Sequence, residues 1–292
     1  MKEAQKKEEN LRWMREISAA IKLSEESTRE IIALYEKEYR HIDFIAKRKF
    51  SPAGCVKILF TERLLKKEKA YTYLLAAVIL KAKQTHKLYR KKGISDEIFY
   101  DTMGDIRIWS ENFRNKKGFT GIDNIGWIQN HLGCKIFRLG RLQFQPFFFY
   151  LPPYVNKAKR KGTDIKIGAK VLNVHIPQGE KLLREECEKS FRMAEEFFSD
   201  YHYRAFICES WLLCERNREF MSEDSNIIRF GEMFEILGSS DNPSQAIERI
   251  FGKKEDKPDD YPESTILQRQ CKAYIISGGT PGTGFGIIRR KN

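Results

Sequence analysis

The sequence has no apolar run of about 18 residues, the length that a membrane-crossing helix needs. It does not open with the basic, apolar and small-residue pattern of a signal peptide. Its six cysteines include no CxxC pair, and four of them lie in apolar periodic segments, so a disulfide framework or a zinc site is not indicated. We therefore expect a cytoplasmic protein without a membrane span or a bound metal, whose thiols are reduced and packed in the core.

The composition is that of a globular protein, because 12% aromatic and 41% hydrophobic residues are too many for a disordered chain. The 292 residues suffice for one large or two ordinary domains. A net charge of +13 attracts polyanions, CoA-type phosphates or membrane surfaces, and the charge does not distinguish among them. The net charge is the one feature of the sequence that would support a nucleic-acid partner. The basic run at residues 157–162 lacks the interleaved aromatic side chains of a single-strand binding platform, so we expect none.

Residues 1–133 predict an all-helical N-terminal domain. Apolar residues recur at three- and four-residue spacing, as at Leu11, Met14 and Ile17. Ser24 and Ser95 precede acidic residues, which is typical of helix starts. We find no chemistry in this half and expect its basic residues to form solvated faces.

From Gly133 onward the pattern changes to the period of two that half-buried strands show. Residues 134–292 therefore predict a mixed β-sheet with flanking helices, and the whole chain an α+β fold. We expect strands in the ranges Cys134–Gln145 (with a bulge or hairpin at Gly140), Val171–Ile176, Tyr203–Leu213, Asn226–Phe230 and Phe285–Ile288. We expect helices from about Glu180 to Phe198, at Ser244–Phe251 and at Thr265–Ile276, and a basic loop at Lys157–Gly162.

The segment from Val171 to Leu182 combines a strand, a tight turn and a helix start. Pro177 ends the strand because it has no N–H to donate, and Gly179 permits a sharp turn. Such a segment directs free N–H groups and the positive end of a helix dipole at one point, which suits a phosphate. The same pattern also describes any ordinary strand-to-helix connection of an α/β protein.

Four segments together carry a family resemblance: Phe137–Phe144, Val174–Gly179, Cys208–Leu213 and Ser225–Phe230. In their order and spacing the chain resembles a two-domain bacterial acyltransferase family, with a helical N-terminal domain and a GNAT-like C-terminal domain. The resemblance implies an acyl-CoA co-substrate, acetyl-CoA or another. It also implies that the pantetheine arm lies between two splayed parallel strands, Val171–Ile176 and Arg204–Trp211.

The resemblance further implies which residues hold the CoA: Val174, Ile176, Gln178, Gly179, Glu180 and Lys181. The usual GNAT phosphate loop has the form Gln/Arg-x-x-Gly-x-Gly/Ala, whereas this loop has one glycine, followed by the acidic Glu180. This departure leaves a second reading open, in which the protein is a non-catalytic GNAT-like module that binds CoA or a protein partner.

Acyl transfer to an amine of a small molecule or peptide needs a base, because an amine with a pKa near ~10.4 is protonated at neutral pH. Glu209 stands in an otherwise apolar strand, where a buried carboxylate without a cationic partner would have a raised pKa. His175 lies in the facing strand of the implied pair. We predict that these two residues are catalytic; alternatively, each is a buried polar group satisfied by a neighbour.

Several other side chains in this half are of types that could take part in the same chemistry. Cys208 fits core packing better than a nucleophile. Tyr150, Tyr201 and Tyr203 are equal candidates for protonating the departing thiolate. The sequence does not name the acyl group, the acceptor or the oligomeric state.

Overall fold

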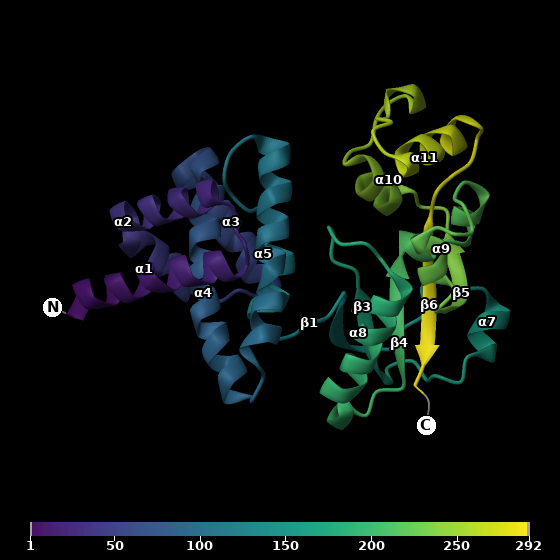
Figure 1. Cartoon of the computed structure of the whole chain (residues 1–292), viewed down its shortest axis with the longest axis horizontal. Coiled ribbons are helices and arrows are strands. Elements are labelled where there is room, and N and C mark those ends of the chain that lie inside the picture. The colour runs from purple at the N-terminus through teal and green to yellow at the C-terminus, as the bar shows by residue number, and fades with distance from the viewer. Residues whose placement is uncertain (1, 291–292) are drawn as a thin grey trace. The chain divides into compact units, whose positions relative to one another are not determined.

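The computed structural model describes residues 2–290 and divides into two compact units (Figure 1). The helical unit comprises the chain up to Leu139 together with Pro177–Gly179. The sheet unit comprises Gly140–Ile176 and the chain from Glu180 onward. Each unit is described by itself below.

The helical unit is built around α4 (Ala70–Lys91), whose residues from Leu74 to Ile79 are all buried. Every other α-helix of the unit packs against α4. The predicted helix starts are confirmed, since the hydroxyls of Ser24 and Ser95 each accept a backbone N–H in the first turn that follows. The remaining elements are α1 (Lys2–Ala20), α2 (Glu25–Lys47), α3 (Pro52–Lys66), η1 (Lys67–Lys69), α5 (Asp96–Lys117), α6 (Ile125–Leu132) and the short strand β1 (Phe137–Leu139).

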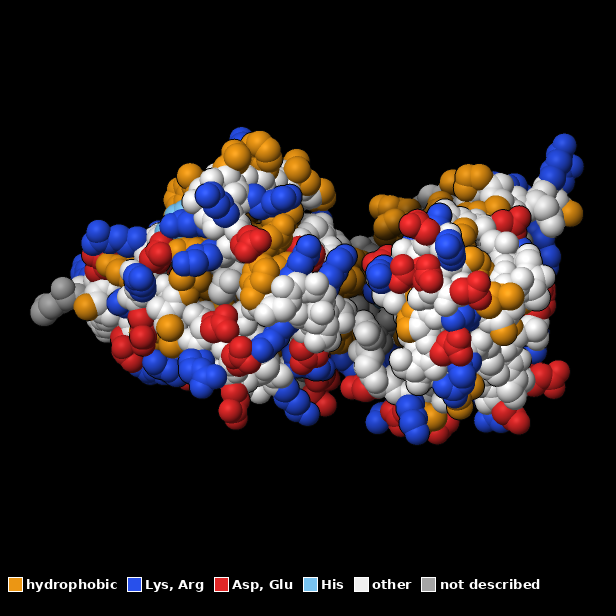
Figure 2. Space-filling model, turned by 90° about the horizontal axis from the view of Figure 1, so that it is seen from above, with side chains coloured by type: hydrophobic (Ala, Val, Ile, Leu, Met, Phe, Trp, Pro, Cys, Tyr) orange, Lys and Arg blue, Asp and Glu red, His pale blue; other side chains and the backbone are white. Residues whose placement is uncertain are grey.

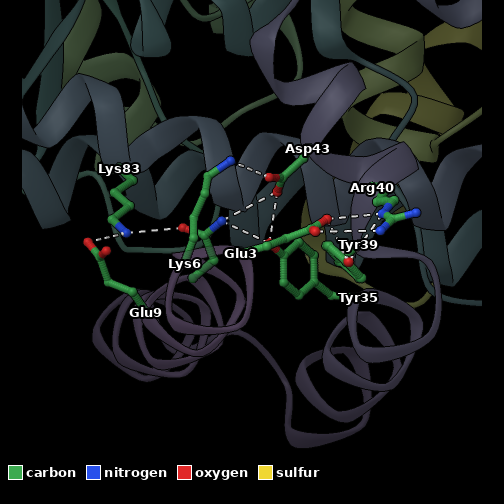
Figure 3. Close-up of polar contacts among 9 residues, drawn as sticks. Glu3, Lys6, Glu9, Tyr35, Tyr39, Arg40, Asp43 and Lys83 are labelled. Atoms are coloured by element: carbon green, nitrogen blue, oxygen red, sulfur yellow. Dashed lines mark hydrogen bonds and ion pairs between the residues drawn. The ribbon is translucent and has the colours of Figure 1, made fainter. Parts of the chain in front are cut away.

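A polar network joins α1 to α2 (Figure 3). Asn10 Nδ2 donates to the Tyr35 hydroxyl at 2.8 Å, and that hydroxyl donates to Asp43 Oδ1 at 2.8 Å. Lys6 Nζ donates to the other carboxylate oxygen of Asp43 at 2.6 Å. Asn10 and Tyr35 are both buried, so these bonds satisfy polar groups that would otherwise destabilise the interface between the two helices.

The sheet unit contains the elements of a mixed sheet with flanking helices, which confirms the predicted α+β class. The strand order is β1-β2-β3-β4-β6-β5; β3 and β4 are parallel, whereas β2 with β3, β4 with β6 and β5 with β6 are antiparallel. The elements are β2 (Leu142–Phe148), α7 (Lys157–Gly162), β3 (Lys170–His175), α8 (Arg184–Phe197), η2 (Ser199–Tyr201), β4 (Ala205–Ser210), η3 (Trp211–Leu213), η4 (Glu215–Glu219), α9 (Asn226–Gly231), β5 (Glu235–Ser240), α10 (Ser244–Phe251), η5 (Pro258–Asp260), α11 (Ile266–Ile276) and β6 (Thr283–Arg289).

The two faces of the central strands bury different sets of side chains, because successive residues of a strand point to opposite faces. On one face, Phe144 and Phe206 pack against Phe191 of α8. On the other face, Val171 and Ile207 belong to a core that also holds the following residues: Phe149, Val155, Ile165, Ala205, Leu237, Phe285 and Ile287. By alternation, Asn173, His175 and Glu209 continue this second face.

Three local predictions were wrong. Asn226–Phe230 is helical, in α9, because the Ser225 hydroxyl accepts the N–H of Ile227 at 3.2 Å and caps a helix. Residues 157–162 form α7 instead of a loop, and Asn156 caps it. The helix after β3 begins at Arg184, so an irregular loop of eight residues, 176–183, precedes it.

The hairpin point between β1 and β2 is confirmed. Gly140 adopts φ +69°, a left-handed conformation that favours glycine. A Cβ added there would lie 2.9 Å from Ser190 Oγ, so glycine also permits the close approach to α8.

Candidate functional site

The parallel pair β3 and β4 separates toward its C-terminal end. In residues 2–290, ladder partners between the two strands are limited to Leu172 with Phe206 and Asn173 with Ile207. Beyond them, β3 stays paired with β2 as far as His175, and β4 stays paired with β6 as far as Ser210. Each strand keeps its outer neighbour beyond the point at which the parallel ladder between β3 and β4 ends.

A pocket of about 550 Å³ lies beside this gap, within the sheet unit. It is open to solvent, and each residue that lines it has a polar group in its side chain, with no Lys or Arg among the described residues that line it. This absence stands out because the chain carries a net charge of +13. The lining residues are Tyr150, Tyr154, Asn173, His175, Glu209, Ser240, Asn242, Ser244, Gln245 and Thr283.

Glu209 is held by two phenols at the centre of this lining. Tyr150 Oη donates to Glu209 Oε2 at 2.5 Å, and Tyr154 Oη donates to Glu209 Oε1 at 2.7 Å. The ring of Tyr150 packs against Phe285, with 5.4 Å between the ring centroids. The expectation of a buried carboxylate was wrong: Glu209 is exposed in the pocket, because β4 has lost its inner neighbour at this level.

The two phenols are protonated donors at neutral pH. Burial raises the pKa of Tyr150, and the hydrogen bond to Glu209 raises it further. The same two causes, in the same order, raise the pKa of Tyr154. Tyr154 was not predicted, and its sequence context of Pro153 and Val155 carries no signal for it.

His175 lines the same pocket, so the two residues predicted to be catalytic share one site. Its Nε2 donates to Gln145 Oε1 of the neighbouring strand at 3.0 Å, which fixes the ring. Asn173, two residues earlier on the same face of β3, also lines the pocket.

The six residues predicted to hold CoA lie between positions 174 and 181, and none of the six lines the pocket. Val174 and Ile176 lie at and just after the end of β3, and Gln178, Gly179, Glu180 and Lys181 are exposed in the loop that follows. Gly179 adopts φ +116°. In the helical unit, to which Pro177–Gly179 belongs, Gln178 Oε1 accepts a hydrogen bond from Asn112 at 3.0 Å.

The start of α8 lies directly after this loop. Its N-cap, Leu183, makes no side-chain capping bond, so the first N–H groups of the helix are available to an anion. Glu185 and Glu186 in the first turn oppose a negative ligand.

Arg141 is a further residue of this region that sequence reasoning missed. Its guanidinium donates to two consecutive carbonyls of the loop, Glu180 O at 2.8 Å and Lys181 O at 3.0 Å. Its own N–H donates to Ser190 Oγ of α8 at 2.8 Å. Arg141 is buried and brings a positive charge against the loop; in the sequence it reads only as a polar residue of an alternating strand.

The other candidates lie elsewhere. Cys208 is fully buried on the opposite side of β4 from Glu209, and burial raises the pKa of its thiol, which opposes thiolate formation. Tyr201 donates to Phe147 O and Tyr203 is buried, so of the three candidate tyrosines Tyr150 lines the pocket. Across residues 2–290, all six cysteines are free, no cluster of side chains is suited to a metal, and no helix is long and apolar enough to cross a membrane.

Solved structures of similar fold are acyltransferases. One, in complex with decanoyl-CoA and teicoplanin, is 20% identical and aligns over 94% of this chain and 87% of its own, with a TM-score of 0.73. A second, a mutant acyltransferase in complex with octanoyl-CoA, is also 20% identical and aligns over 95% of this chain and 87% of its own, with a TM-score of 0.75. No curated protein matches the sequence.

Two family models match the sequence in succession. The N-acyltransferase N-terminal domain matches residues 13–134, and the GNAT-like C-terminal domain matches residues 136–288, more than half of the chain. The resemblance drawn from the four sequence motifs is therefore confirmed. The chain belongs to a family of two-domain acyltransferases in which an N-acyltransferase N-terminal domain precedes a GNAT-like C-terminal domain.

Proposed function

We propose that the protein is an acyl-CoA-dependent N-acyltransferase that transfers the acyl group directly to an amine. The observation that carries the proposal is the convergence of Glu209 and His175 in one pocket beside the separated ends of β3 and β4. Complexes of similarly folded acyltransferases with decanoyl-CoA and octanoyl-CoA support acyl-CoA as the donor. We assign this chemistry to a C-terminal domain of residues 134–292, preceded by a helical domain of residues 1–133.

The donor site consists of the gap between β3 and β4 and the loop after β3. Acyl-CoA supplies an activated thioester carbonyl. Backbone N–H groups at the edges of β3 and β4 that face the gap stabilise the negative charge that develops on the oxygen of this carbonyl during transfer. The loop residues Gln178–Lys181 and the uncapped start of α8 hold the pyrophosphate, and buried Arg141 offsets part of the repulsion from Glu180.

The acceptor site is the polar pocket itself. A pocket with one carboxylate and no Lys or Arg, in a chain of net charge +13, attracts an ammonium group and does not attract an anion. The hydroxyl and amide side chains around it suit a polar acceptor, either a small molecule or a peptide. A similarly folded acyltransferase has teicoplanin and decanoyl-CoA bound together, which supports a ternary complex.

Glu209 acts as the general base and Tyr150 as the acid. Glu209 accepts a proton from the ammonium and releases it to the solvent of the open pocket, and the free amine attacks the thioester carbon. Glu209 then takes the second proton from the nitrogen of the tetrahedral intermediate. When the C–S bond breaks, the thiolate takes the phenolic proton of Tyr150, and Glu209 returns its proton to Tyr150 across their 2.5 Å hydrogen bond. Tyr154 and His175 position the carboxylate and the acceptor.

A non-catalytic CoA-binding module is the second candidate. The single glycine of the loop, with Glu180 beside it, favours this reading, because fewer N–H groups can converge on a phosphate. It predicts CoA binding without turnover with any amine.

Replacing Glu209 with Gln distinguishes between the two candidate functions. We expect Glu209→Gln to lower amine-dependent release of the CoA thiol about 10²- to 10⁴-fold, because the base is lost, and to leave acyl-CoA affinity within about twofold. Thiol release and calorimetric titration measure the two quantities. Glu235→Gln on β5, an exposed carboxylate outside the pocket lining, is the control. Unchanged turnover in Glu209→Gln would remove Glu209 from the role.

A further inference from the structure

Helix α3 exposes a row of large apolar side chains to solvent. Val56, Phe60 and Leu64 follow one another at four-residue spacing and are 70%, 66% and 68% exposed. The adjacent Leu65 is 63% exposed. We define the α3 patch as these four residues together with Phe44 of α2, which is 59% exposed.

The opposite face of α3 is fixed to the helical unit. Cys55, Ile58 and Glu62 are buried there. Glu62 Oε2 lies 2.8 Å from His41 Nε2 of α2, one helical turn before Phe44. These contacts attach α3 to the helical unit by its buried face, and packing within the unit does not require large apolar side chains on the exposed face as well.

The chain segment that carries the α3 patch is rich in basic residues. Between residues 44 and 69 there are eight Lys or Arg and two Glu, so this segment has a net charge of 8 − 2 = +6, nearly half of the +13 of the whole chain. Of the two acids, Glu62 is buried and Glu68 is exposed. Figure 2 shows hydrophobic side chains interspersed with Lys and Arg on the surface of the helical part. The basic residues are Lys47, Arg48, Lys49, Lys57, Arg63, Lys66, Lys67 and Lys69.

We propose that the α3 patch docks on an anionic lipid surface. Exposed Phe and Leu side chains flanked by Lys and Arg are the combination that lies in a membrane interface, with the apolar groups among the acyl chains and the cations at the headgroups. If a second copy of the chain covered the patch, two segments with a net charge of +6 each would face and repel one another. Charge complementarity therefore favours an anionic occupant. The proposed contact is peripheral, because it is made by exposed side chains on the surface of the helical unit. This inference does not depend on the proposed function.

Vesicle flotation of the full chain tests the proposal. We expect binding to phosphatidylglycerol vesicles and none to phosphatidylcholine vesicles, with the affinity decreasing as salt is raised. The double variant Phe60→Ser/Leu64→Ser should lower the affinity at least about tenfold, because two inserted side chains are lost. Lys57→Glu/Arg63→Glu should lower it similarly.

Matched variants elsewhere control for general effects. Ile266→Ser/Ile276→Ser removes two side chains of α11 that are 66% and 54% exposed, and Lys157→Glu/Lys161→Glu reverses two charges on α7; both should bind like the wild type. Circular dichroism verifies that each variant is folded.

Three results would overturn the proposal. The first is that the wild type does not bind anionic vesicles. The second is full binding by Phe60→Ser/Leu64→Ser, which would mean that charge alone attracts the protein. The third is a lipid-free dimer in analytical ultracentrifugation that the same variant dissociates, because a second copy would then cover the patch.

Discussion

At the scale of single residues, the site depends on how Glu209 is held. Two phenols engage its two carboxylate oxygens, so the side chain is fixed although it is exposed. The sequence identified Glu209 as an acid in an apolar strand, and its burial was predicted wrongly. The separation of β3 from β4, which exposes it, is a non-local feature that no residue near Glu209 encodes.

The tyrosines give a prediction on pH dependence. Because burial and the contact with Glu209 raise the pKa values of Tyr150 and Tyr154, both phenols lose their protons at a higher pH than the ordinary value of ~10. Tyrosine ionisation should therefore not lower kcat/KM between pH 7 and about 10. A pH–rate profile of the wild type and of Tyr154→Phe tests this. An alkaline decrease below pH 10 that the variant lacks would contradict it.

Arg141 gives a prediction on stability and binding together. Arg141→Met removes two hydrogen bonds to the loop carbonyls of Glu180 and Lys181, so we expect the free energy of unfolding to fall by about 2–4 kcal/mol. Acyl-CoA affinity should fall as well, because the loop loses its anchor. Arg141→Lys keeps the positive charge but cannot donate to both carbonyls in the same way, so its stability and its acyl-CoA affinity should lie between those of the wild type and Arg141→Met. Urea denaturation and titration measure both effects; wild-type values for Arg141→Met would exclude the anchoring role.

At the scale of elements, the loop between β3 and α8 is the part that most affects the proposed function. Gly179→Val forces a side chain into φ +116°, and we expect it to lower the free energy of unfolding by about 1–3 kcal/mol and to weaken CoA binding. Gly168→Val is the matched control: Gly168 has φ +82°, and at both glycines no atom lies within 4 Å of an added Cβ. The control should lose stability and keep its CoA affinity. If Gly179→Val binds CoA like the wild type, the phosphate-loop assignment is wrong.

The type of each element was predicted correctly where the periodic pattern extended over a long segment, and wrongly where the segment was short. The helical half was predicted because α2, α4 and α5 each span more than twenty residues with a regular apolar stripe. Residues 226–230 were predicted as a strand, since a run of five with Ile227, Ile228 and Phe230 fits both periods. The Ser225 cap decides for the helix. The start of α8 was placed too early because Glu180 and Lys181 fit the helical pattern, although they lie in the loop held by Arg141.

At the scale of the whole molecule, the sequence indicated the order of the elements along the chain, but it did not indicate which strands pair with one another in the sheet. The switch from helical to period-two patterning at Gly133 predicted the α+β class, and four short motifs predicted the family. The strand order β1-β2-β3-β4-β6-β5 and the gap beside β4 depend on contacts between distant segments. Tyr154 and Arg141 act through those contacts, and this explains why neither was predicted.

The proposed acyl-CoA site can be tested by calorimetric titration of the purified protein with CoA and with acyl-CoA at two salt concentrations. We expect micromolar binding of both ligands at one site. The affinity should be lower at high salt, because a phosphate contact is screened. It should not vanish, because in the proposed site the pantetheine arm also binds uncharged backbone groups. No detectable binding of either ligand would contradict the acyl-CoA site between β3 and β4, and with it the proposed acyl transfer.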